Sequence, residues 1–250
     1  MFESIKRFFS TRATGRNLGE AIEWAERSGH DIRRAKGDEG FVIDGAFQGK
    51  PWRMEWGPAQ RAYIEGHELR MRMELHLPPD QQMLLLSRSL TDSLERQTYE
   101  QFIDTVQTRI DTQTPEEVRW LVMFPKIDFS GLNALGTRFE AVASQPEVGL
   151  SWIEGPLASR LEREARQGLL LDDPPFVLMT LRGRAYMRLQ MTTPAATDIA
   201  SALVLFETAA AQAIRVAPTV TDTAAAWSAT ASTSWQSLQP DDEVDPRKRR

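Results

Sequence analysis

Residues 67–77 read His67-Glu-Leu-Arg-Met-Arg-Met-Glu-Leu-His-Leu77, and from Glu68 onward polar and apolar side chains alternate without a break. Successive side chains of a β-strand point to opposite faces of its sheet, so this alternation predicts a strand with one buried and one solvated face. Strands with a solvated face are typical of antiparallel sheets, because parallel sheets are usually covered on both sides. The buried face would hold Leu69, Met71, Met73, Leu75 and Leu77.

Two β-hairpins are predicted in addition to this strand. In the first, residues 41–47 and 52–56 flank a turn at Gln48 and Gly49. In the second, residues 176–181 and 184–191 flank a turn at Arg182 and Gly183. A short turn with glycine between two alternating segments is a strong local signal for a hairpin.

Amphipathic helices are expected to cover the sheet, which makes the predicted fold class α+β. A long helix over residues 80–112 has apolar side chains every three to four positions and is the expected main cover. A second helix over residues 194–216 is expected to have Thr193 as its N-cap and Pro194 in its first turn. The other expected elements are helices over residues 18–28, 132–142 and 156–167 and strands over residues 117–124 and 148–153.

The chain is expected to form two similar lobes that meet near Pro115. The first lobe would span residues 17–114 and the second residues 115–216, each with a hairpin between helices. This similarity fits either an ancient duplication or the chance recurrence of a common unit. Residues 217–250, rich in Thr, Ser and Ala, are expected to form a disordered tail, because they have few large apolar side chains.

The first 16 residues are expected to be a flexible lead-in. They combine basic side chains with apolar ones at near-helical spacing, which also fits a membrane-surface anchor or a targeting segment. No uninterrupted apolar run reaches the ~18–20 residues that a transmembrane helix needs, so the sequence predicts no membrane span. The basic residues are Lys6, Arg7, Arg12 and Arg16, and the apolar ones are Phe2, Ile5, Phe8 and Phe9.

Composition excludes several classes of site. The chain has no Cys, so disulfides, thiolate nucleophiles and cysteine-ligated zinc are ruled out, and a reducing compartment such as the cytoplasm is the expected location. The formal net charge of -5 argues against a dedicated nucleic-acid-binding protein, since phosphate contacts usually require a basic surface. We therefore expect another protein as the partner.

No motif in the sequence predicts a catalytic, cofactor or metal site. The three histidines, His30, His67 and His76, form no metal-ligand spacing, and each is expected to be structural or solvated. Glu65 and Glu68 flank His67 and could serve acid–base chemistry, but a polar turn explains them more simply. Gly131 and Gly136 have the spacing of a phosphate-binding loop, but Thr137 and Arg138 follow where Lys and Ser or Thr are needed, so Ser130 capping a helix is the favoured interpretation.

The candidate interaction residues are arginines on the solvated face and tryptophans in the tail. Arg53, Arg61, Arg70 and Arg72 could form a basic strip for an acidic peptide or a single strand of nucleic acid. Glutamates interleave with them, which favours an ordinary solvated face with cross-strand ion pairs. Trp227 and Trp235 could dock on a partner, fold back on the body or simply be tolerated.

Two functions are compatible with these features. The first is a non-enzymatic protein-interaction module, of adaptor or chaperone type, with a tethered tail that adds a second contact. The second is a small-molecule or lipid-binding domain with a pocket between the lobes. That pocket would be lined by Trp52, Met54, Met71 and Met73.

Overall fold

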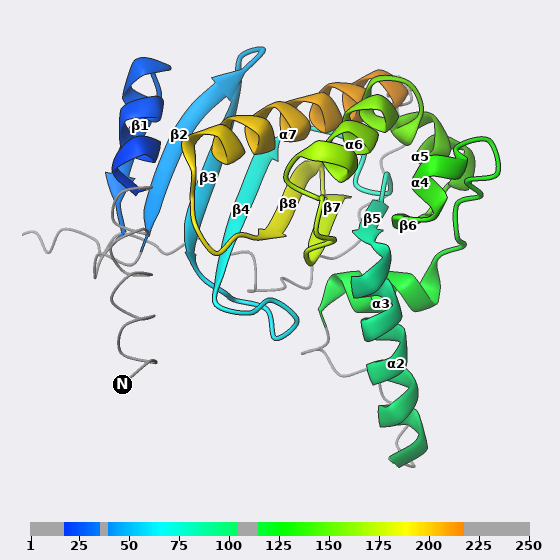
Figure 1. The fold of residues 1–250 in the computed structure, drawn as a ribbon. Helices are drawn as coiled ribbons and strands as arrows, with labels where there is room; N and C mark the ends of the chain where they lie inside the picture. The colour runs from blue at the N-terminus through cyan, green and yellow to red at the C-terminus, as the bar shows by residue number, and fades with distance from the viewer. Residues whose placement is uncertain (1–17, 36–39, 105–114, 218–250) are drawn as a thin grey trace, which may run out of the picture. The chain divides into compact units, whose positions relative to one another are not determined.

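A computed structural model describes residues 18–35, 40–104 and 115–217 of the chain, all within one compact unit. It contains a single sheet with strand order β1-β2-β3-β4-β8-β7-β5-β6, in which all neighbours are antiparallel (Figure 1). The predicted α+β class is confirmed. The strands are β1 (Asp31–Arg34), β2 (Phe41–Phe47), β3 (Lys50–Pro58), β4 (His67–Glu74), β5 (Met83–Ser87), β6 (Phe139–Ala143), β7 (Phe176–Leu181) and β8 (Arg184–Gln190).

Both predicted hairpins are confirmed, and their turns share one geometry. Gln48 and Gly49 join β2 to β3 with φ of 50° and 77°, and Arg182 and Gly183 join β7 to β8 with φ of 51° and 79°. Positive φ at both central residues is the mark of the type I′ turn, whose twist matches that of the flanking strands. Glycine adopts this conformation without strain, which explains its place in each turn.

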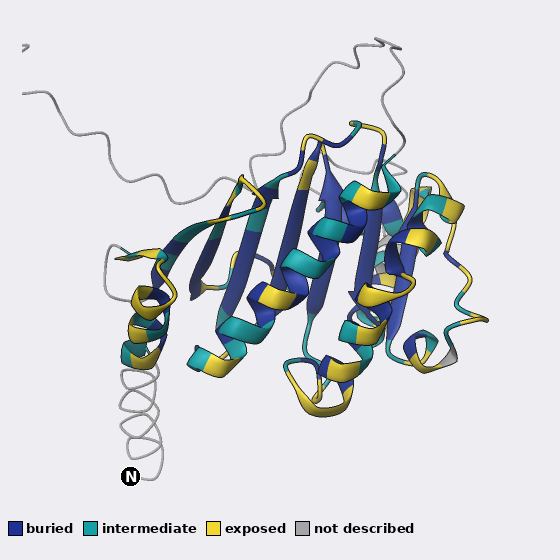
Figure 2. Ribbon diagram, turned by 90° about the horizontal axis from the view of Figure 1, so that it is seen from above, coloured by how far each residue is buried: buried dark blue, intermediate teal, exposed yellow. Residues whose placement is uncertain are grey.

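Helices cover one face of the sheet along its whole width. A helix over residues 18–27 lies against the β1–β2 end, and α7 (Ala196–Val216), α6 (Pro156–Gln167) and α5 (Pro146–Ile153) cover the rest. In Figure 2 the strands behind these helices are almost entirely buried, while the outer sides of the helices are exposed. The core between the two layers includes Met54, Met71, Met187, Leu178 and Leu85, one from each of five adjoining strands, all at most 1% exposed.

The opposite face of the sheet is covered differently at the β5–β6 end and over the middle strands. At the β5–β6 end, α2 (Arg88–Asp104) and α3 (Glu116–Met123) bury apolar side chains, whereas α4 (Asn133–Gly136) is a single turn before β6. Over the middle strands β3, β4 and β8, the face is charged and the loop over residues 59–66 packs on part of it. This second face is where the functional candidates lie.

The expected long helix over residues 80–112 is wrong in its first part, and its last part, residues 105–112, lies outside the described residues. Residues 83–87 form β5, a strand paired with β6 on one side and β7 on the other, and the helix begins only at Arg88. Four consecutive residues, Met83 to Leu86, are each at most 1% exposed, because helices lie over both faces of this strand. A continuous apolar run suits a strand covered on both sides, so α7 rather than this helix provides the main cover of the sheet.

Three short segments in the second half also differ from expectation. Residues 117–124 were expected as a strand but form most of α3, and residues 148–153 belong to α5. Residues 132–142 were expected as a helix, but only one helical turn forms before β6. Pro146 opens α5 and Glu147 follows it, which are ordinary helix-start signals.

The ends of three other elements are close to expectation. The helices over residues 18–27 and 156–167 are confirmed, and Gly29 follows the first with φ of 74°. The helix expected from Pro194 begins at Ala196, with Ala195 rather than Thr193 at the N-cap.

Strands from both halves of the sequence form one sheet. β4 of the first half pairs with β8 of the second, and β5 of the first half pairs with β6 and β7 of the second. The expected boundary near Pro115 therefore does not separate two sheets. The expected lead-in at residues 1–16 and the expected tail at residues 217–250, Ala217 apart, lie outside the described residues.

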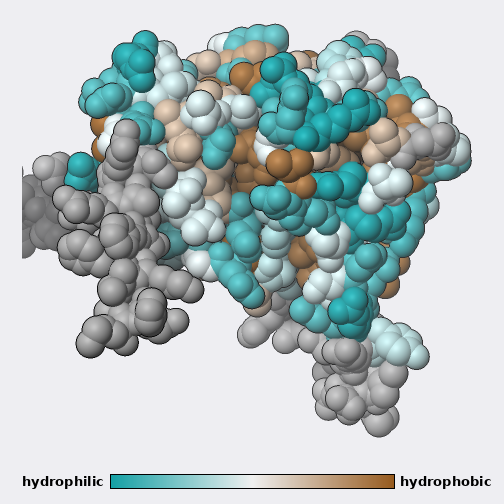
Figure 3. Space-filling model, viewed as in Figure 1, coloured by the Kyte–Doolittle hydropathy of each residue, from teal (hydrophilic) through white to brown (hydrophobic). Residues whose placement is uncertain are grey.

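Among the described helices, α7 is long and apolar enough to cross a membrane by length and composition. Half of that stretch, 50%, is buried inside the protein, and its Phe206 and Ala210 are fully buried. On the side of the molecule that α7 and α6 cover, Figure 3 shows mostly hydrophilic residues with hydrophobic patches between them. This pattern is typical of a core helix with one face on a sheet.

Candidate functional site

Charged side chains form a buried network on the second face of the sheet. Glu55 on β3, Arg70 on β4 and Arg188 on β8 are direct cross-strand neighbours, and Glu68 lies one place along the same face. The expected solvated face is therefore only partly solvated. Glu68 and Arg188 are both fully buried, and Glu55 and Arg70 are each 7% exposed.

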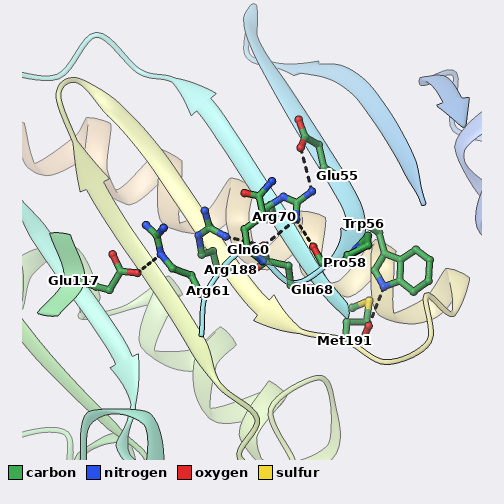
Figure 4. Close-up of polar contacts among 10 residues, drawn as sticks. All are labelled: Glu55, Trp56, Pro58, Gln60, Arg61, Glu68, Arg70, Glu117, Arg188 and Met191. Carbon is green, nitrogen blue, oxygen red and sulfur yellow. Dashed lines mark hydrogen bonds and ion pairs between the residues drawn. The ribbon is translucent and has the colours of Figure 1, made fainter. Parts of the chain in front are cut away.

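Glu68 is the centre of this network (Figure 4). Its Oε1 accepts hydrogen bonds from Arg188 Nη1 at 2.7 Å, from Arg70 Nη1 at 2.8 Å and from the backbone N–H of Gln60 at 3.0 Å. Arg70 also donates to Glu55 Oε2 at 3.4 Å and to the carbonyl of Pro58 at 3.1 Å. One buried carboxylate thus joins two strands and the loop that follows β3.

A second part of the network attaches α3 to the same loop. Glu117 on α3 is fully buried, and its Oε1 accepts from Arg61 Nε at 2.6 Å and from the Tyr63 hydroxyl at 2.5 Å. Burial alone would raise the pKa of Glu117, but Arg61 and Tyr63 outweigh it, so that the pKa is lowered and the carboxylate stays ionised. Burial and the nearby Glu117 charge raise the pKa of Tyr63 well above its usual value, which keeps the phenol a donor.

The network is balanced in charge, which indicates a structural role. It holds three carboxylates, from Glu55, Glu68 and Glu117, and three guanidinium groups, from Arg61, Arg70 and Arg188. Burial lowers the pKa of Arg188, which shows how strongly this site disfavours an uncompensated charge. These paired charges connect the loop and α3 to the sheet.

Removing the Tyr63 hydroxyl tests the attachment of α3. We expect Tyr63→Phe to lower the free energy of unfolding by about 1.5–3 kcal/mol, the range for a hydrogen bond to a charged group. Urea unfolding followed by tryptophan fluorescence measures this loss. Tyr99→Phe, at an exposed tyrosine on α2, is the matched control and should change stability by less than about 0.5 kcal/mol. If the two variants lower the free energy of unfolding by the same small amount, the Tyr63–Glu117 hydrogen bond does not hold α3 to the loop.

The expected arginine strip is divided by the structure. Arg61 and Arg70 are buried in the network, whereas Arg53 is partly exposed and forms a two-pronged pair with Asp44, at 2.7 and 3.2 Å. Arg72 lies on the same face, directly opposite Arg53. The four side chains therefore do not form one continuous exposed surface, although Arg53 and Arg72 are brought together.

Two of the three histidines contact tryptophan rings, and the third is exposed. His67 stacks on Trp56 with ring centroids 4.6 Å apart, His30 lies 4.9 Å from Trp52, and His76 is exposed. Across the described ranges there is no cluster of three or more His, Asp and Glu side chains that could hold a metal ion. Glu68 is engaged in ion pairs, so the expected polar turn around Gly66 is in part a buried charge site.

The expected cap at Ser130 is also different. Its hydroxyl bonds to Asp128 at 2.9 Å, and the short α4 starts after Leu132 without a side-chain cap.

The four side chains expected to line a ligand pocket are packed in the core instead. Trp52, Met54, Met71 and Met73 are at most 2% exposed and belong to the cluster beneath the helices. Their shared face lies between two layers rather than between two lobes. Trp227 and Trp235, the other expected interaction residues, lie outside the described residues.

An apolar groove lies between α2 and α3. It has a volume of about 240 Å³. Two of the side chains that line it are apolar and more than half exposed, with Tyr99 67% exposed and Val122 58% exposed. Figure 1 shows α2 extending away from the end of β5, so this surface stands clear of the sheet. The groove is lined by Leu94, Glu95, Thr98, Tyr99, Val118, Leu121 and Val122.

Sequence reasoning missed this groove because it placed residues 117–124 in a strand. As a helix, the same residues put Val118, Leu121 and Val122 on one side, three to four positions apart. They put Glu117 and Trp120 on the buried side. A helical periodicity test on residues 116–123 was the available signal, but eight residues are too few for it to be decisive.

Comparison with known proteins assigns this chain to no family. No protein-family model matches the chain, and no curated protein matches it either. Among solved structures, the crystal structure of the mycobacterial trehalose monomycolate transport factor A, TtfA, is similar at a TM-score of 0.46 and 12% sequence identity, over 84% of this chain and 99% of that chain. We draw no functional conclusion from a likeness of this size.

Proposed function

We propose that this chain is a non-enzymatic protein-interaction module that binds an apolar-faced helix of a partner protein in the α2–α3 groove. The observation that carries the proposal is that Tyr99 and Val122, each more than half exposed, both line that groove. Exposed apolar side chains are ordinary when scattered, but a group of them beside a groove is typical of an interaction surface.

The size of the groove favours side chains over a free small molecule. Pockets for drug-sized ligands usually measure about 300–1,000 Å³, whereas this groove has about 240 Å³ and is open to solvent. A groove between two helices suits a third helix, whose apolar residues at i, i+3 or i+4 enter as anchors. We therefore favour a helical segment of another protein over a lipid or metabolite.

The charges near the groove favour an apolar contact as well. Glu95 pairs with Lys126 at 2.9 Å, and Glu116 pairs with Arg119 at 3.1 Å. Opposite charges that are already paired leave little net field to select a charged partner. The expected occupant is thus a helix with large apolar anchors and no strong net charge.

The proposal also covers the tail and the cellular compartment. Trp227 and Trp235 would give the chain a second, tethered contact with the same partner, which raises the effective concentration of the first. The cytoplasm is the proposed compartment, since a chain without cysteine needs no oxidising surroundings.

Cross-linking from the groove tests the proposal. A photoreactive amino acid placed at Val122 of the full chain, in its native cells, should capture one partner through a defined segment. A synthetic peptide of that segment should then bind the purified full chain. Val122→Asp should weaken this binding at least tenfold, because a charge enters an apolar contact. Fluorescence anisotropy of the labelled peptide measures the change.

Val204→Asp is the matched control, since Val204 is an exposed valine, 45% exposed, on the unrelated α7. It should leave peptide binding unchanged. Equal weakening by both variants, or capture of a segment that does not bind as a peptide, would contradict the proposal. If the captured protein is a second copy of this chain, the groove is a homodimer interface and the proposed separate partner protein is wrong.

A further inference from the structure

Arg72 is a positive charge without a counter-ion on the second face of the sheet. It is partly buried, in the middle of β4, and it forms no hydrogen bond or ion pair across the described ranges 18–35, 40–104 and 115–217. Its direct cross-strand neighbours are Arg53 on β3 and Tyr186 on β8. Like charges directly opposite each other destabilise a sheet, so the native fold carries an unfavourable contact here.

The charges around Arg72 are already engaged elsewhere. Four arginines surround it. Arg53 lies directly opposite on β3, Arg70 lies two residues back along β4, and Arg184 and Arg188 lie diagonally on β8. Each has a carboxylate partner: Arg53 has Asp44, Arg70 has Glu68 and Glu55, Arg184 has Glu74, and Arg188 has Glu68. The carboxylates nearest to Arg72 are therefore used, and its own guanidinium is the surplus positive charge of the patch.

Solvent reaches this patch from one side. The side chain of Arg184 is 48% exposed, that of Glu74 35% and that of Arg53 26%, in contrast with the buried network next to them. A small group could thus approach Arg72 without displacing the buried pairs.

We propose that Arg72 binds an oxyanion, a carboxylate or phosphate group of a small ligand, on the β3–β4–β8 face. A guanidinium presents its donors in a planar fork that matches carboxylate and phosphate oxygens. The neighbouring arginines are each paired with a carboxylate, so the site keeps the one surplus charge of Arg72, and a bound anion offsets this charge and the repulsion between Arg72 and Arg53. This site is separate from the α2–α3 groove and does not depend on the function proposed for it.

Inorganic phosphate is the probe for this site. At a phosphate concentration about tenfold above its Kd, we expect the Tm of the full chain to rise by about 3–6 °C relative to chloride at equal ionic strength. Arg72→Gln should remove this rise. Without phosphate, the same variant should melt at the same or a higher temperature than the native chain, because the repulsion with Arg53 is gone. Acetate in place of phosphate distinguishes a carboxylate site from a phosphate site.

Arg96→Gln on α2 is the matched control, since Arg96 is exposed and has no counter-ion in the described part of the chain. It should keep the full phosphate response. General salt effects on stability act on all variants alike, so an equal rise in Arg72→Gln would overturn the proposal. A lower Tm of Arg72→Gln in chloride would also overturn it, because Arg72 would then stabilise the empty protein.

Discussion

Glu68→Gln is expected to lower the free energy of unfolding by about 3–5 kcal/mol, the cost of breaking a buried ion pair by removing one partner. The substitution keeps the size of the side chain but removes the carboxylate charge that the guanidinium groups of Arg70 and Arg188 share. Arg188 is fully buried and cannot turn to water. Urea unfolding at neutral pH measures the loss directly.

Glu154→Gln is the control for this experiment. Glu154 is exposed, just after α5, so its replacement should change stability by less than about 0.5 kcal/mol. A loss below about 1 kcal/mol for Glu68→Gln would mean that the network is hydrated or rearranges easily. The charged half of the second face would then not be a fixed structural element.

Phe206→Ala on α7 is expected to cost about 3–5 kcal/mol, as for other fully buried phenylalanines. Phe206 is 0% exposed and lies in the core that α7 shares with the sheet. Its removal leaves a cavity that the surrounding strands can only partly fill. The same denaturation measurement applies.

Val204→Ala, on the exposed side of the same helix, should cost less than about 0.5 kcal/mol. The contrast between the two positions distinguishes a core helix from one that leaves the protein to enter a membrane. If Phe206→Ala were as mild as Val204→Ala, α7 would not be held on the sheet, and its apolar composition would need another explanation.

The parts of the fold that sequence alone predicted are those with strong local signals. The alternation from Glu68 onward and the two turns with glycine each fix a strand or hairpin through a few adjacent residues, although the strand expected to reach Leu77 ends at Glu74. The helices over residues 156–167 and 196–216 have enough turns to show their periodicity. In each case the local preference and the final packing agree.

The parts that sequence did not predict are short apolar runs whose type is set by distant partners. Met83 to Leu86 are a strand because β6 and β7 lie on either side of them, and neither partner is close in sequence. Residues 116–123 and 146–153 are helices of only eight residues. A run of that length fits a buried strand equally well, so periodicity cannot separate the two.

The candidate sites were hidden for a related reason. Glu68 and Arg188 are 120 positions apart, and their ion pair exists only because β4 and β8 adjoin. On a single strand, Glu68 and Arg70 look like ordinary solvated residues. The surplus charge of Arg72 likewise appears only when each neighbouring arginine is matched to its carboxylate.

The pairing of β4 with β8 also has a consequence for synthesis on the ribosome. β8 emerges roughly 120 residues after β4, which at ~5–20 residues per second is a delay of about 6–24 seconds. Throughout that interval the nascent chain carries β4 with one edge unpaired, and the arginines on β8 that pair with its carboxylates are not yet synthesised. Chaperone contact during translation is therefore expected to concentrate on residues 67–87, after which the arrival of the second hairpin completes the sheet in a single late step.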